Sequence, residues 1–487
     1  MSSILALADA QAALPEILLV VSALVLLMLG VMRDRPESFD LISILAVIAL
    51  AGAAGLVILG GPEQTTAFNG SLVVDTFARV MKVMVLFASA LAIIMSTSTM
   101  KAEKLDRFEY PVLILMATVG MMVMISANHL LTLYLGLELM TLSLYAMVAL
   151  QRDSAVATEA AMKYFVLGAL ASGLLLYGMS MLYGATTTLE ITELAQMIGE
   201  GAMIGPVLVF GLVFVVAGIG FKLGAVPFHM WVPDVYHGAP TAVTLFVSSA
   251  PKIAAFAFIM RLLGQALGAE ALTAEWRQML MVMAVLSLVI GNVTAIVQTN
   301  LKRMLAYSTI SHMGFVLLGI LAGNEIGYSA AMFYVIVYVL MTLGAFGMIL
   351  LLSRSGFEAE NLEDFKGLNQ RSPWYAFVML LIMFSMVGIP PTVGFYAKLA
   401  VLQSVLALGT LGIVLAVIAV LFSAVGAFYY LRVVKLMYFD APTDTAELAP
   451  RGDVKVVMTL NGLAVLYFGI VPGPLMSLCL YSIQASL

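Results

Sequence analysis

Residues 374–408 read WYAFVMLLIMFSMVGIPPTVGFYAKLAVLQSVLAL, and this stretch decides the fold. It is almost entirely apolar and longer than the roughly 20 residues that a helix needs to cross a bilayer. A Gly-Ile-Pro-Pro sequence at 388–391 interrupts it, because proline removes a helical hydrogen bond and clashes with the preceding turn. Its one charged side chain is Lys398. The stretch therefore predicts a broken membrane-spanning helix with a lysine inside the bilayer.

The composition of the whole chain is that of a membrane protein. Of its 487 residues, 62% are hydrophobic and 10% are charged, whereas a soluble domain is about half apolar and a quarter charged. The net charge of −5 is spread along the chain without a basic patch, which argues against nucleic acid as a partner. The single cysteine, Cys479, cannot hold an iron–sulfur cluster or form an internal disulfide. The four histidines show no metal-ligand spacing, so no metal site is predicted.

Apolar runs separated by charged or Gly/Pro-rich breaks predict an all-α integral membrane protein with about fourteen transmembrane helices. Residues 1–15 lack the basic region and cleavage site of a signal peptide, so we expect the first helix to be retained. The predicted helices lie near 14–32, 41–60, 73–98, 110–128, 130–150, 157–184, 203–225, 240–267, 277–298, 301–322, 326–353, 374–408, 411–439 and 456–484.

The distribution of lysine and arginine predicts the orientation of these helices. One set of alternate loops carries Arg33, Arg35, Lys101, Lys104, Arg107, Arg152, Lys302, Arg303, Arg354, Lys366, Arg371, Arg432, Lys435, Arg451 and Lys455. The other set carries only Arg261 and Arg277. Because cytoplasmic loops hold the excess of basic residues, the first set is predicted to be cytoplasmic and both termini periplasmic.

The remaining six basic residues fall inside predicted helices, and they are Arg79, Lys82, Lys163, Lys222, Lys252 and Lys398. Glu138 also lies within an apolar run. A charge at the centre of a spanning helix costs about 2.5–3.5 kcal/mol on insertion scales and usually marks a functional site. Burial can lower the pKa of a lysine by several units, whereas arginine stays protonated. A series of buried lysines beside a carboxylate therefore suits a proton relay, although Arg79 and Lys82, near Asp75, fit a packing role equally well.

Two of the predicted helices, the seventh and the twelfth, contain helix breakers beside a lysine: Pro227 follows Lys222, and Pro390 and Pro391 precede Lys398. Broken helices with ionisable residues at mid-depth are typical of transporters with internal repeats. The breaks are five helices apart, so helices 4–8 (110–267) and 9–13 (277–439) are predicted to form two inverted repeats. A three-helix segment (1–100) precedes them and a final helix (456–487) follows. GFKL at 220–223 and GFYAKL at 394–399 give a short internal match.

His312 is the one histidine predicted to lie inside the membrane, next to Ser308, Thr309 and Ser311. Histidine can change its protonation state near neutral pH, so a relay role and a structural role remain equally open. The other three, His129, His229 and His237, are predicted to lie at helix ends or in the segment HMWVPDVYHGAPT, where a structural role is favoured.

Four motifs resemble those of a known family: LGLELMTLSLY (135–145), FKLGAVPFHMWVPDVYHGAPT (221–241), NLKRMLAYSTISHMGFVLLG (300–319) and VGIPPTVGFYAKL (387–399). They are similar to motifs of the antiporter-like membrane subunits of respiratory NADH:quinone oxidoreductase (complex I), which are related to multisubunit cation/proton antiporters. The resemblance covers nearly the whole chain. Within the family the chain is most similar to the N-type bacterial subunits, the counterparts of mitochondrial subunit 2, because it ends after the fourteenth helix and has lysine at position 398.

This resemblance implies a proton-translocating subunit of an enzyme complex in the bacterial inner membrane. It implies that Glu138 pairs with Lys222, that Lys252 passes protons along the central axis, and that Lys398 leads to the outlet. Lys163 matches a lysine near the side where protons are taken up, and His312 lies in a family motif without an assigned role.

The resemblance also implies partners: other membrane-arm subunits, including further antiporter-like ones, and membrane lipid. NADH, FMN, iron–sulfur clusters and quinone are expected in those partner subunits and none on this chain, which would itself carry out no redox chemistry. The alternatives are a subunit of a multisubunit Na⁺/H⁺ antiporter, a structural subunit that seals the membrane arm, and a solute symporter, for which no ligand-binding motif is found.

Overall fold

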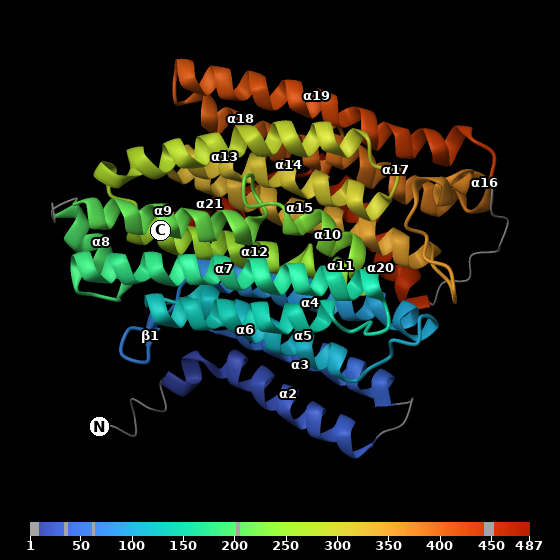
Figure 1. Cartoon of the computed structure of the whole chain (residues 1–487), viewed down its shortest axis with the longest axis horizontal. Helices are drawn as coiled ribbons and strands as arrows, with labels where there is room; N and C mark the ends of the chain where they lie inside the picture. Colours follow the sequence, from blue (N-terminus) through green and yellow to red (C-terminus); the bar gives the residue numbers. More distant parts are fainter. Residues whose placement is uncertain (1–8, 34–37, 61–63, 201–204, 443–451) are drawn as a thin grey trace.

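The computed structural model describes residues 9–33, 38–60, 64–200, 205–442 and 452–487. Most of them form helices that run side by side along the long axis of the molecule (Figure 1). The helices are α2 (Leu14–Met32), α3 (Ser38–Leu59), α4 (Thr76–Ala102), α5 (Glu109–Ser126), α6 (Leu130–Val148), α7 (Ala155–Thr186), α8 (Ile191–Gly199), α9 (Pro206–Leu223), α10 (Trp231–Gly238), α11 (Thr241–Val247), α12 (Ala250–Ile259), α13 (Glu270–Ile296), α14 (Leu301–Leu321), α15 (Glu325–Leu352), α16 (Leu368–Arg371), α17 (Pro373–Val387), α18 (Val393–Leu406), α19 (Thr410–Phe439), α20 (Gly452–Ile470) and α21 (Gly473–Gln484). The other elements are the antiparallel hairpin β1 (Thr65–Ala67) and β2 (Leu72–Val74), the π-helix η1 (Met260–Ala266) and the 3₁₀ turn η2 (Leu362–Phe365).

The predicted all-α membrane fold is confirmed. In the described part of the chain, thirteen segments are long and apolar enough to cross a membrane. The twelfth predicted helix crosses as two shorter apolar helices, α17 and α18, which brings the spans to the predicted fourteen. In a bilayer each backbone N–H and C=O group must be bonded within the protein, and helices meet this requirement along their whole length.

The start of the described chain and its C-terminal end lie toward the same end of the bundle (Figure 1). The Phe68 N–H donates to Asp9 Oδ1 at 3.0 Å, and the Phe77 N–H donates to Ser486 Oγ at 3.0 Å. The two chain ends therefore meet the same short segment at the start of α4, as an even number of spans requires. We call this the terminal end, and we call the opposite end, where α4 ends and α14 begins, the basic end.

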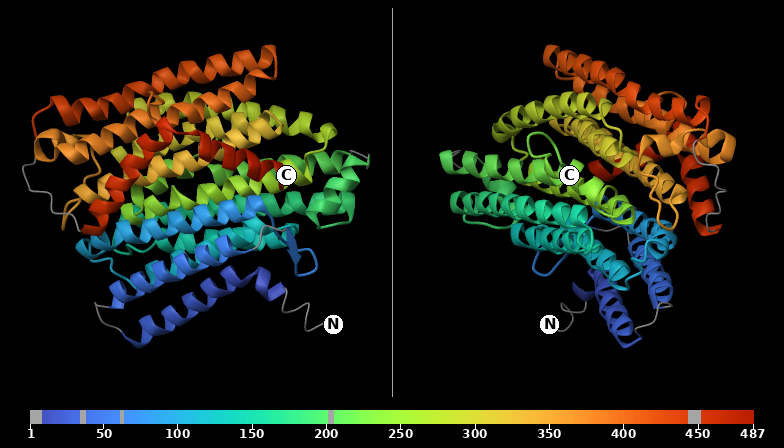
Figure 2. Two further views of the ribbon diagram at one scale, coloured as in Figure 1. Left: turned by 180° about the vertical axis from the view of Figure 1, so that it is seen from behind. Right: turned by 45° about the vertical axis from the view of Figure 1, so that its right-hand side comes forward.

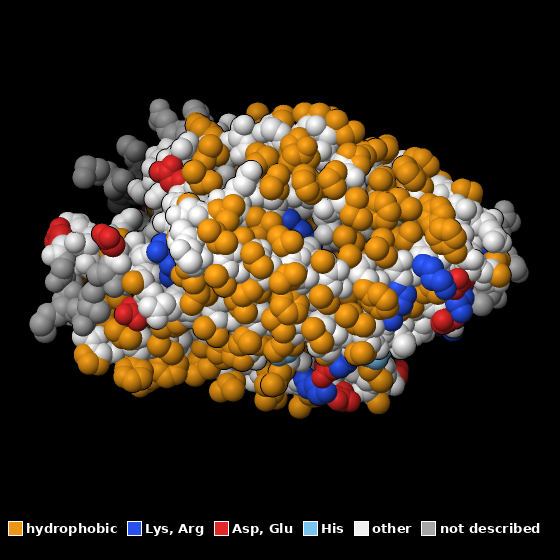
Figure 3. Space-filling view, turned by 90° about the horizontal axis from the view of Figure 1, so that it is seen from above, with side chains coloured by type: hydrophobic (Ala, Val, Ile, Leu, Met, Phe, Trp, Pro, Cys, Tyr) orange, Lys and Arg blue, Asp and Glu red, His pale blue; other side chains and the backbone are white. Residues whose placement is uncertain are grey.

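The interior of the bundle is formed by α11, α12, α14 and α15, whose spans are almost completely buried. The helices α2 and α19 lie at opposite edges in Figure 1 and keep most of their surface exposed, and Figure 2 shows the same order from two other directions. Seen from above, the surface is covered mainly by hydrophobic side chains, and charged ones gather near the two ends and in a cluster on the lower edge of the view (Figure 3). This is the surface that a bilayer requires.

Polar side chains fix where several helices begin and end. Asp75, Ser154 and Asn300 cap α4, α7 and α14 by accepting a hydrogen bond from a backbone N–H of the first turn. Gly224 and Gly388 end α9 and α17 with φ of +76° and +92°, a left-handed conformation that glycine adopts without steric cost. The two glycines place the ends of α9 and α17 inside the bundle, so the predicted breaks in helices seven and twelve are confirmed.

Four details differ from the prediction. The ninth helix, predicted over 277–298, begins at Glu270 as α13, so Arg277, counted as a loop residue, lies inside a helix. The eighth span, predicted as one helix over 240–267, is divided at Ser248–Ser249 and ends in the π-helix η1. The division arises because Pro251 cannot donate a backbone hydrogen bond, and the Ser249 hydroxyl donates to the Leu245 and Phe246 carbonyls. The fourteenth span, predicted over 456–484, is divided before Gly473, after Pro472. The third helix begins at Thr76 and not near 73, because residues 72–74 form β2.

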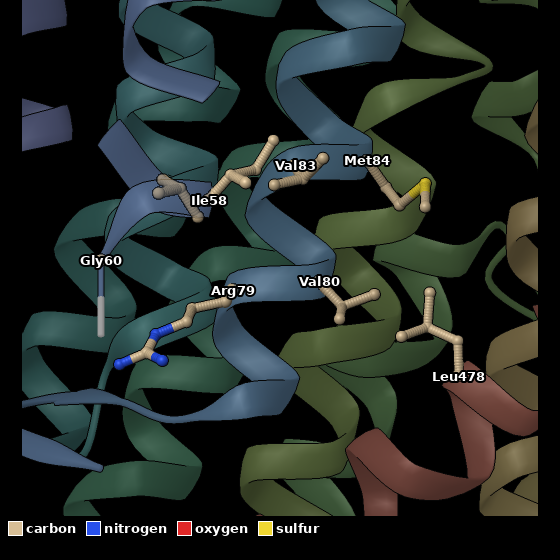
Figure 4. A pocket seen from close by; sticks show the side chains of 8 residues that line it. Ile58, Gly60, Arg79, Val80, Val83, Met84 and Leu478 are labelled. Carbon is tan, nitrogen blue, oxygen red and sulfur yellow. The ribbon is translucent and has the colours of Figure 1, made fainter. Parts of the chain in front are cut away.

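A cavity of about 390 Å³ lies on the outer surface, where α3, α4 and α21 meet. Its lining is apolar apart from the Arg79 side chain, which Figure 4 shows near Gly60 and Ile58. None of the predicted relay residues lines this cavity.

Candidate functional site

Glu138 lies near the middle of α6, whereas Lys222 lies at the end of α9. Glu138, on α6, accepts a hydrogen bond from Ser172 Oγ of α7 at 2.5 Å. Lys222, one residue before the end of α9, donates to Thr141 Oγ1 at 3.1 Å. Thr141 is one helical turn from Glu138 on α6, so the carboxylate and the ammonium approach the same side of this helix. In the described chain no ion pair joins them, and hydroxyl groups hold each in place.

Lys252, on α12, is buried and binds the carbonyl end of α9. Its Nζ donates to the Leu223 carbonyl at 2.8 Å and to the Lys222 carbonyl at 3.3 Å, and it lies 5.1 Å from the Trp231 ring centre. The last carbonyl groups of a helix lack partners within it and carry partial negative charge. The break after Leu223 thus creates a place inside the membrane where an ammonium is stabilised without a carboxylate.

Lys398, on α18, occupies a corresponding position at the second break. Its Nζ donates to the Met386 and Val387 carbonyls at the end of α17, at 3.0 and 2.7 Å, and to Ser423 Oγ of α19 at 2.7 Å. Its ammonium also lies 5.1 Å from the Phe315 ring centre. At the C-terminal ends of both half-helices, α9 and α17, the last carbonyl groups therefore accept hydrogen bonds from a lysine of another helix.

His312 lies at the centre of a cluster of hydroxyl groups. Its Nδ1 is 2.8 Å from the hydroxyl of Tyr334, and its Nε2 is 3.1 Å from the hydroxyl of Tyr430. Tyr430 also bonds Ser308, and Thr309 bonds Tyr338 at 2.9 Å. Because a neutral imidazole has one donor and one acceptor nitrogen, His312 can join the two tyrosine hydroxyls in one hydrogen-bonded chain.

Aromatic and polar side chains connect these sites across the bundle. We call Glu138, Lys222, Lys252, His312 and Lys398, with the side chains between them, the row. From Lys252 the row continues through Trp231 to Tyr236 on α10, whose ring centres lie 6.2 Å apart, and the Tyr236 hydroxyl lies beside Tyr338. Beyond His312, the Tyr334 ring stacks on Phe315, which lies against Lys398.

A small cavity lies between Lys222 and Lys252, and its lining also includes Thr141 and Trp231. Its volume of about 10 Å³ is close to the room that one water molecule needs. A water there would have several polar partners, which is the condition for a bridging water.

Lys163 lies apart from this row, near the basic end of α7. Its ammonium pairs with Glu159 at 2.8 Å and with Asp234 of α10 at 2.7 Å, and Asp234 also pairs with Arg303 of α14 at 2.8 Å. Burial alone would raise the pKa of the Asp234 carboxyl, but Lys163 and Arg303 hold this pKa below its usual range. Asp234 therefore remains ionised and joins α7, α10 and α14.

The other histidines lie outside the row. His129 caps α6 by accepting a hydrogen bond from the Leu131 N–H at 3.3 Å. His229 follows the end of α9, and His237 lies in α10; burial lowers the pKa of both imidazoles. The segment that was predicted as a loop around them thus contains the helix α10.

Several observations correct or extend the sequence prediction. Arg261, counted as a loop residue, is buried and pairs with Asp75 at 2.8 Å, and Lys302, also counted as a loop residue, is buried at the start of α14. The internal match of GFKL with GFYAKL is wrong as a structural correspondence, because the first ends α9 before its break and the second lies in α18 after its break.

Sequence reasoning also missed the hydroxyl partners of the row, which are Thr141, Ser172, Tyr334, Tyr338, Ser423 and Tyr430. The only signal for them is their polar character within apolar runs. In the described residues no group of three or more histidine, cysteine or acidic side chains could hold a metal ion.

Comparison with known proteins places this arrangement in a family. The family described as NADH:quinone oxidoreductase/Mrp antiporter, transmembrane, matches residues 127–423. NADH-quinone oxidoreductase subunit N of Thiobacillus denitrificans is 63% identical over 443 residues, which are 91% of each chain. The chain belongs to the subunit N family of NADH-quinone oxidoreductase. The predicted N-type membership is therefore confirmed.

Solved structures of related complexes contain chains with the same fold. A chain of respiratory complex I from Thermus thermophilus is 32% identical, with a TM-score of 0.81 over 95% of this chain and 98% of that one. A chain of the Mrp complex from a Dietzia species has a TM-score of 0.82 over 97% of each chain, but it is 21% identical and shows the shared fold alone. Subunit N is an antiporter-like membrane subunit of complex I, and the Na⁺/H⁺ antiporter alternative has less support.

Proposed function

We propose that this chain moves protons across the bacterial inner membrane as part of complex I, along the row from Glu138 through Lys222, Lys252 and His312 to Lys398. The observation that carries the proposal is the pair of lysines on the carbonyl ends of broken helices, Lys252 on α9 and Lys398 on α17. Lysine inside a membrane is costly unless it is used or paired. Backbone carbonyls stabilise the ammonium without a fixed negative charge, so the lysine can still release its proton.

The mechanism begins at Glu138. A change of charge at this side chain alters the field at Lys222, which lies on the same side of α6, and so alters the tendency of Lys222 to hold a proton. Protons then pass to Lys252 through the intervening cavity, and along the hydroxyls around His312 toward Lys398. The aromatic contacts at Trp231 and Phe315 carry no proton, so those steps need water.

The two breaks support two inverted repeats, residues 110–267 and 277–439, between the segments 1–100 and 456–487. Gly224 and Gly388 end the first half-helices, and Pro227 and Pro391 follow each glycine at the same interval of three residues. This correspondence replaces the GFKL match. Each repeat would supply one half-channel, with Lys163 near the basic end of the first.

The basic end faces the cytoplasm in this proposal, and both termini face the periplasm, because most lysines and arginines of the loops lie at the basic end. The partners are other membrane-arm subunits, including antiporter-like ones, and lipid. NADH, FMN, iron–sulfur clusters and quinone bind in partner subunits, and this chain carries out no redox chemistry. Its single cysteine, Cys479, is buried and could not ligate a cluster alone.

The test is NADH-driven proton pumping in membrane vesicles with the Lys222→Ala variant, measured together with NADH:quinone reductase activity and assembly of the complex. We expect an assembled complex in which pumping and reductase activity fall together. The matched control is Lys435→Ala, which removes an exposed lysine paired with Asp440 at the basic end and should leave both activities unchanged. If Lys222→Ala assembles and both activities stay at wild-type level, Lys222 is architectural and the proposal fails.

A further inference from the structure

A second group of ionisable side chains lies at the basic end, outside the row. Lys302, at the start of α14, has a side chain that is only 1% exposed. It pairs with Glu358 at 3.1 Å and with Glu360 at 3.8 Å, and its Nζ donates to the Ala239 carbonyl at 2.9 Å. Thr241 also donates to Glu358. The segment after α15 is thus held against the turn that joins α10 to α11.

Glu103, the residue that ends α4, is the further member of this group. The charged groups that face it are Glu358, from the segment after α15, and Lys302, from α14. Its Oε1 is buried and has no hydrogen-bond partner among the described residues, although the residue as a whole is partly exposed. Lys101 and Lys104, on its own segment, are exposed. The Lys302 ammonium is therefore paired with Glu358 and Glu360, and Glu103 lies within reach of its charge without an ion pair in the described chain.

The pKa values of Glu358 and Glu103 shift in opposite directions. Burial alone would raise the pKa of Glu358, but Lys302 and the hydrogen bond from Thr241 hold it below its usual range. Burial, and then the charge of Glu358, raise the pKa of Glu103 to about 7, while Lys302 opposes this rise. Near neutral pH, Glu358 is ionised and Glu103 exchanges a proton with water.

The group touches the polypeptide that leads into the row. Lys302 binds the Ala239 carbonyl directly after α10, and Thr244 Oγ1 of α11 donates to the Tyr236 carbonyl at 3.0 Å. The Tyr236 hydroxyl lies beside Tyr338, which neighbours His312. Lys302 and Thr244 thus both bond backbone carbonyls of the segment 236–239, which carries the tyrosine of the row.

We propose that Glu103, with Glu358 and Lys302, forms a proton-collecting site that takes protons from water at the basic end and delivers them toward Tyr236 and His312. The Glu103 carboxylate accepts a proton from hydronium in the water at the basic end, which leaves a water molecule, and later releases the proton inward, which restores the carboxylate. Lys302 compensates the charge of Glu358 throughout. This inference rests on the proposed proton translocation and adds an uptake site to it.

The experiment uses the assembled complex in membrane vesicles with Glu103→Gln, which keeps the size of the side chain and removes its ability to titrate. NADH-driven pumping is measured at one pH unit above and one below the pKa of Glu103. We expect a fall of about tenfold above this pKa, smaller than the ~100-fold or more that a lost proton-transfer group typically costs, because water can still reach the inner groups directly. The matched control is Glu363→Gln, an exposed glutamate at the same end that pairs with Lys366 and should pump like wild type.

Lys222→Ala, measured in parallel, separates the two proposals. If it abolishes pumping while Glu103→Gln pumps like wild type at both pH values, the collecting site is refuted and the proposed function stands. If Glu103→Gln does not assemble, Glu103→Asp decides. The shorter carboxyl group changes the distances to Glu358 and Lys302, so the midpoint of the pH profile of pumping must shift; an unchanged midpoint overturns the collecting site.

Discussion

The buried ion pair between Arg261 and Asp75 allows a quantitative test of how this bundle is held together. Arg261 comes from η1, and Asp75 precedes α4, so the pair joins the eighth span to the N-terminal segment. The side chains are 2% and 1% exposed and lie 2.8 Å apart. Arg261 also donates to the Ile125 carbonyl at 3.1 Å and to Gln265 Oε1 at 3.0 Å.

Two single variants and their combination separate charge from packing. Arg261→Met leaves the Asp75 carboxylate buried and unpaired, and breaking a buried pair in this way costs about 3–5 kcal/mol. Asp75→Asn leaves the arginine unpaired, and it retains a side-chain oxygen that can accept the Ala78 N–H, now 2.7 Å from Oδ1, so the start of α4 is preserved. The double variant removes both charges, and such replacements are often nearly neutral. We therefore expect the double variant to be destabilised by about 3 kcal/mol less than the sum of the two single variants.

The assay is the thermal midpoint of the detergent-solubilised complex for the wild type and the three variants, with the amount of complex in membranes as a second readout. Lys435→Met serves as a control, because its partner Asp440 forms an exposed pair that contributes at most about 1 kcal/mol. Additive shifts in the midpoint, or single variants that equal the control, would refute the claim that Arg261 and Asp75 depend on each other.

Three further predictions concern the helix break, the collecting site and Glu138. Gly224→Ala places a methyl group on a residue in the left-handed conformation and against Val232, so we expect a loss of about 1–2 kcal/mol of stability and slower pumping. Gly173→Ala, whose added methyl group meets no atom within 4 Å, should change neither stability nor pumping. Equal thermal midpoints of the two variants would contradict this prediction. Because the pKa of Glu103 is raised from 4.5 to about 7, its stabilising contribution is present below the lower value and is lost as pH rises through the upper one. As the pH rises across this range, the stability of the wild type should therefore fall by up to about 3 kcal/mol relative to that of Glu103→Gln. Parallel pH–stability curves of the two proteins would argue against the raised pKa of Glu103. Ser172→Ala removes the hydroxyl bonded to Glu138 at 2.5 Å and should slow pumping several-fold in an assembled complex, so unchanged pumping would show that this contact has no role.

The spans and their breaks could be predicted from the sequence because a bilayer imposes simple requirements. A run of apolar residues must form a helix there, and a Gly-Ile-Pro-Pro sequence such as 388–391 must interrupt it. The same hydropathy argument selected Lys222, Lys252 and Lys398, since charge within an apolar run is conspicuous.

What the sequence could not show is which way each side chain points and what it meets. Lys252 and Lys398 bind backbone carbonyls of other helices, and a carbonyl has no signature in a sequence. Arg261 lies close to the end of its span, as a loop residue would, and only the approach of Asp75 reveals that it is buried. The break at Ser248–Ser249 was missed although Pro251 follows it, because membrane helices also tolerate proline without ending.

A substitution of Lys252 tests most directly the claim that protons move along the row, because this lysine is buried and, among the described residues, hydrogen-bonds backbone carbonyls alone. The measurement is proton pumping and NADH oxidation, followed together in proteoliposomes that contain the purified complex with Lys252→Met, with Lys435→Met as the control. The account predicts an intact complex in which pumping and oxidation fall together by a large factor, while the control equals wild type. An intact Lys252→Met complex that pumps and oxidises NADH at wild-type rates would contradict the account.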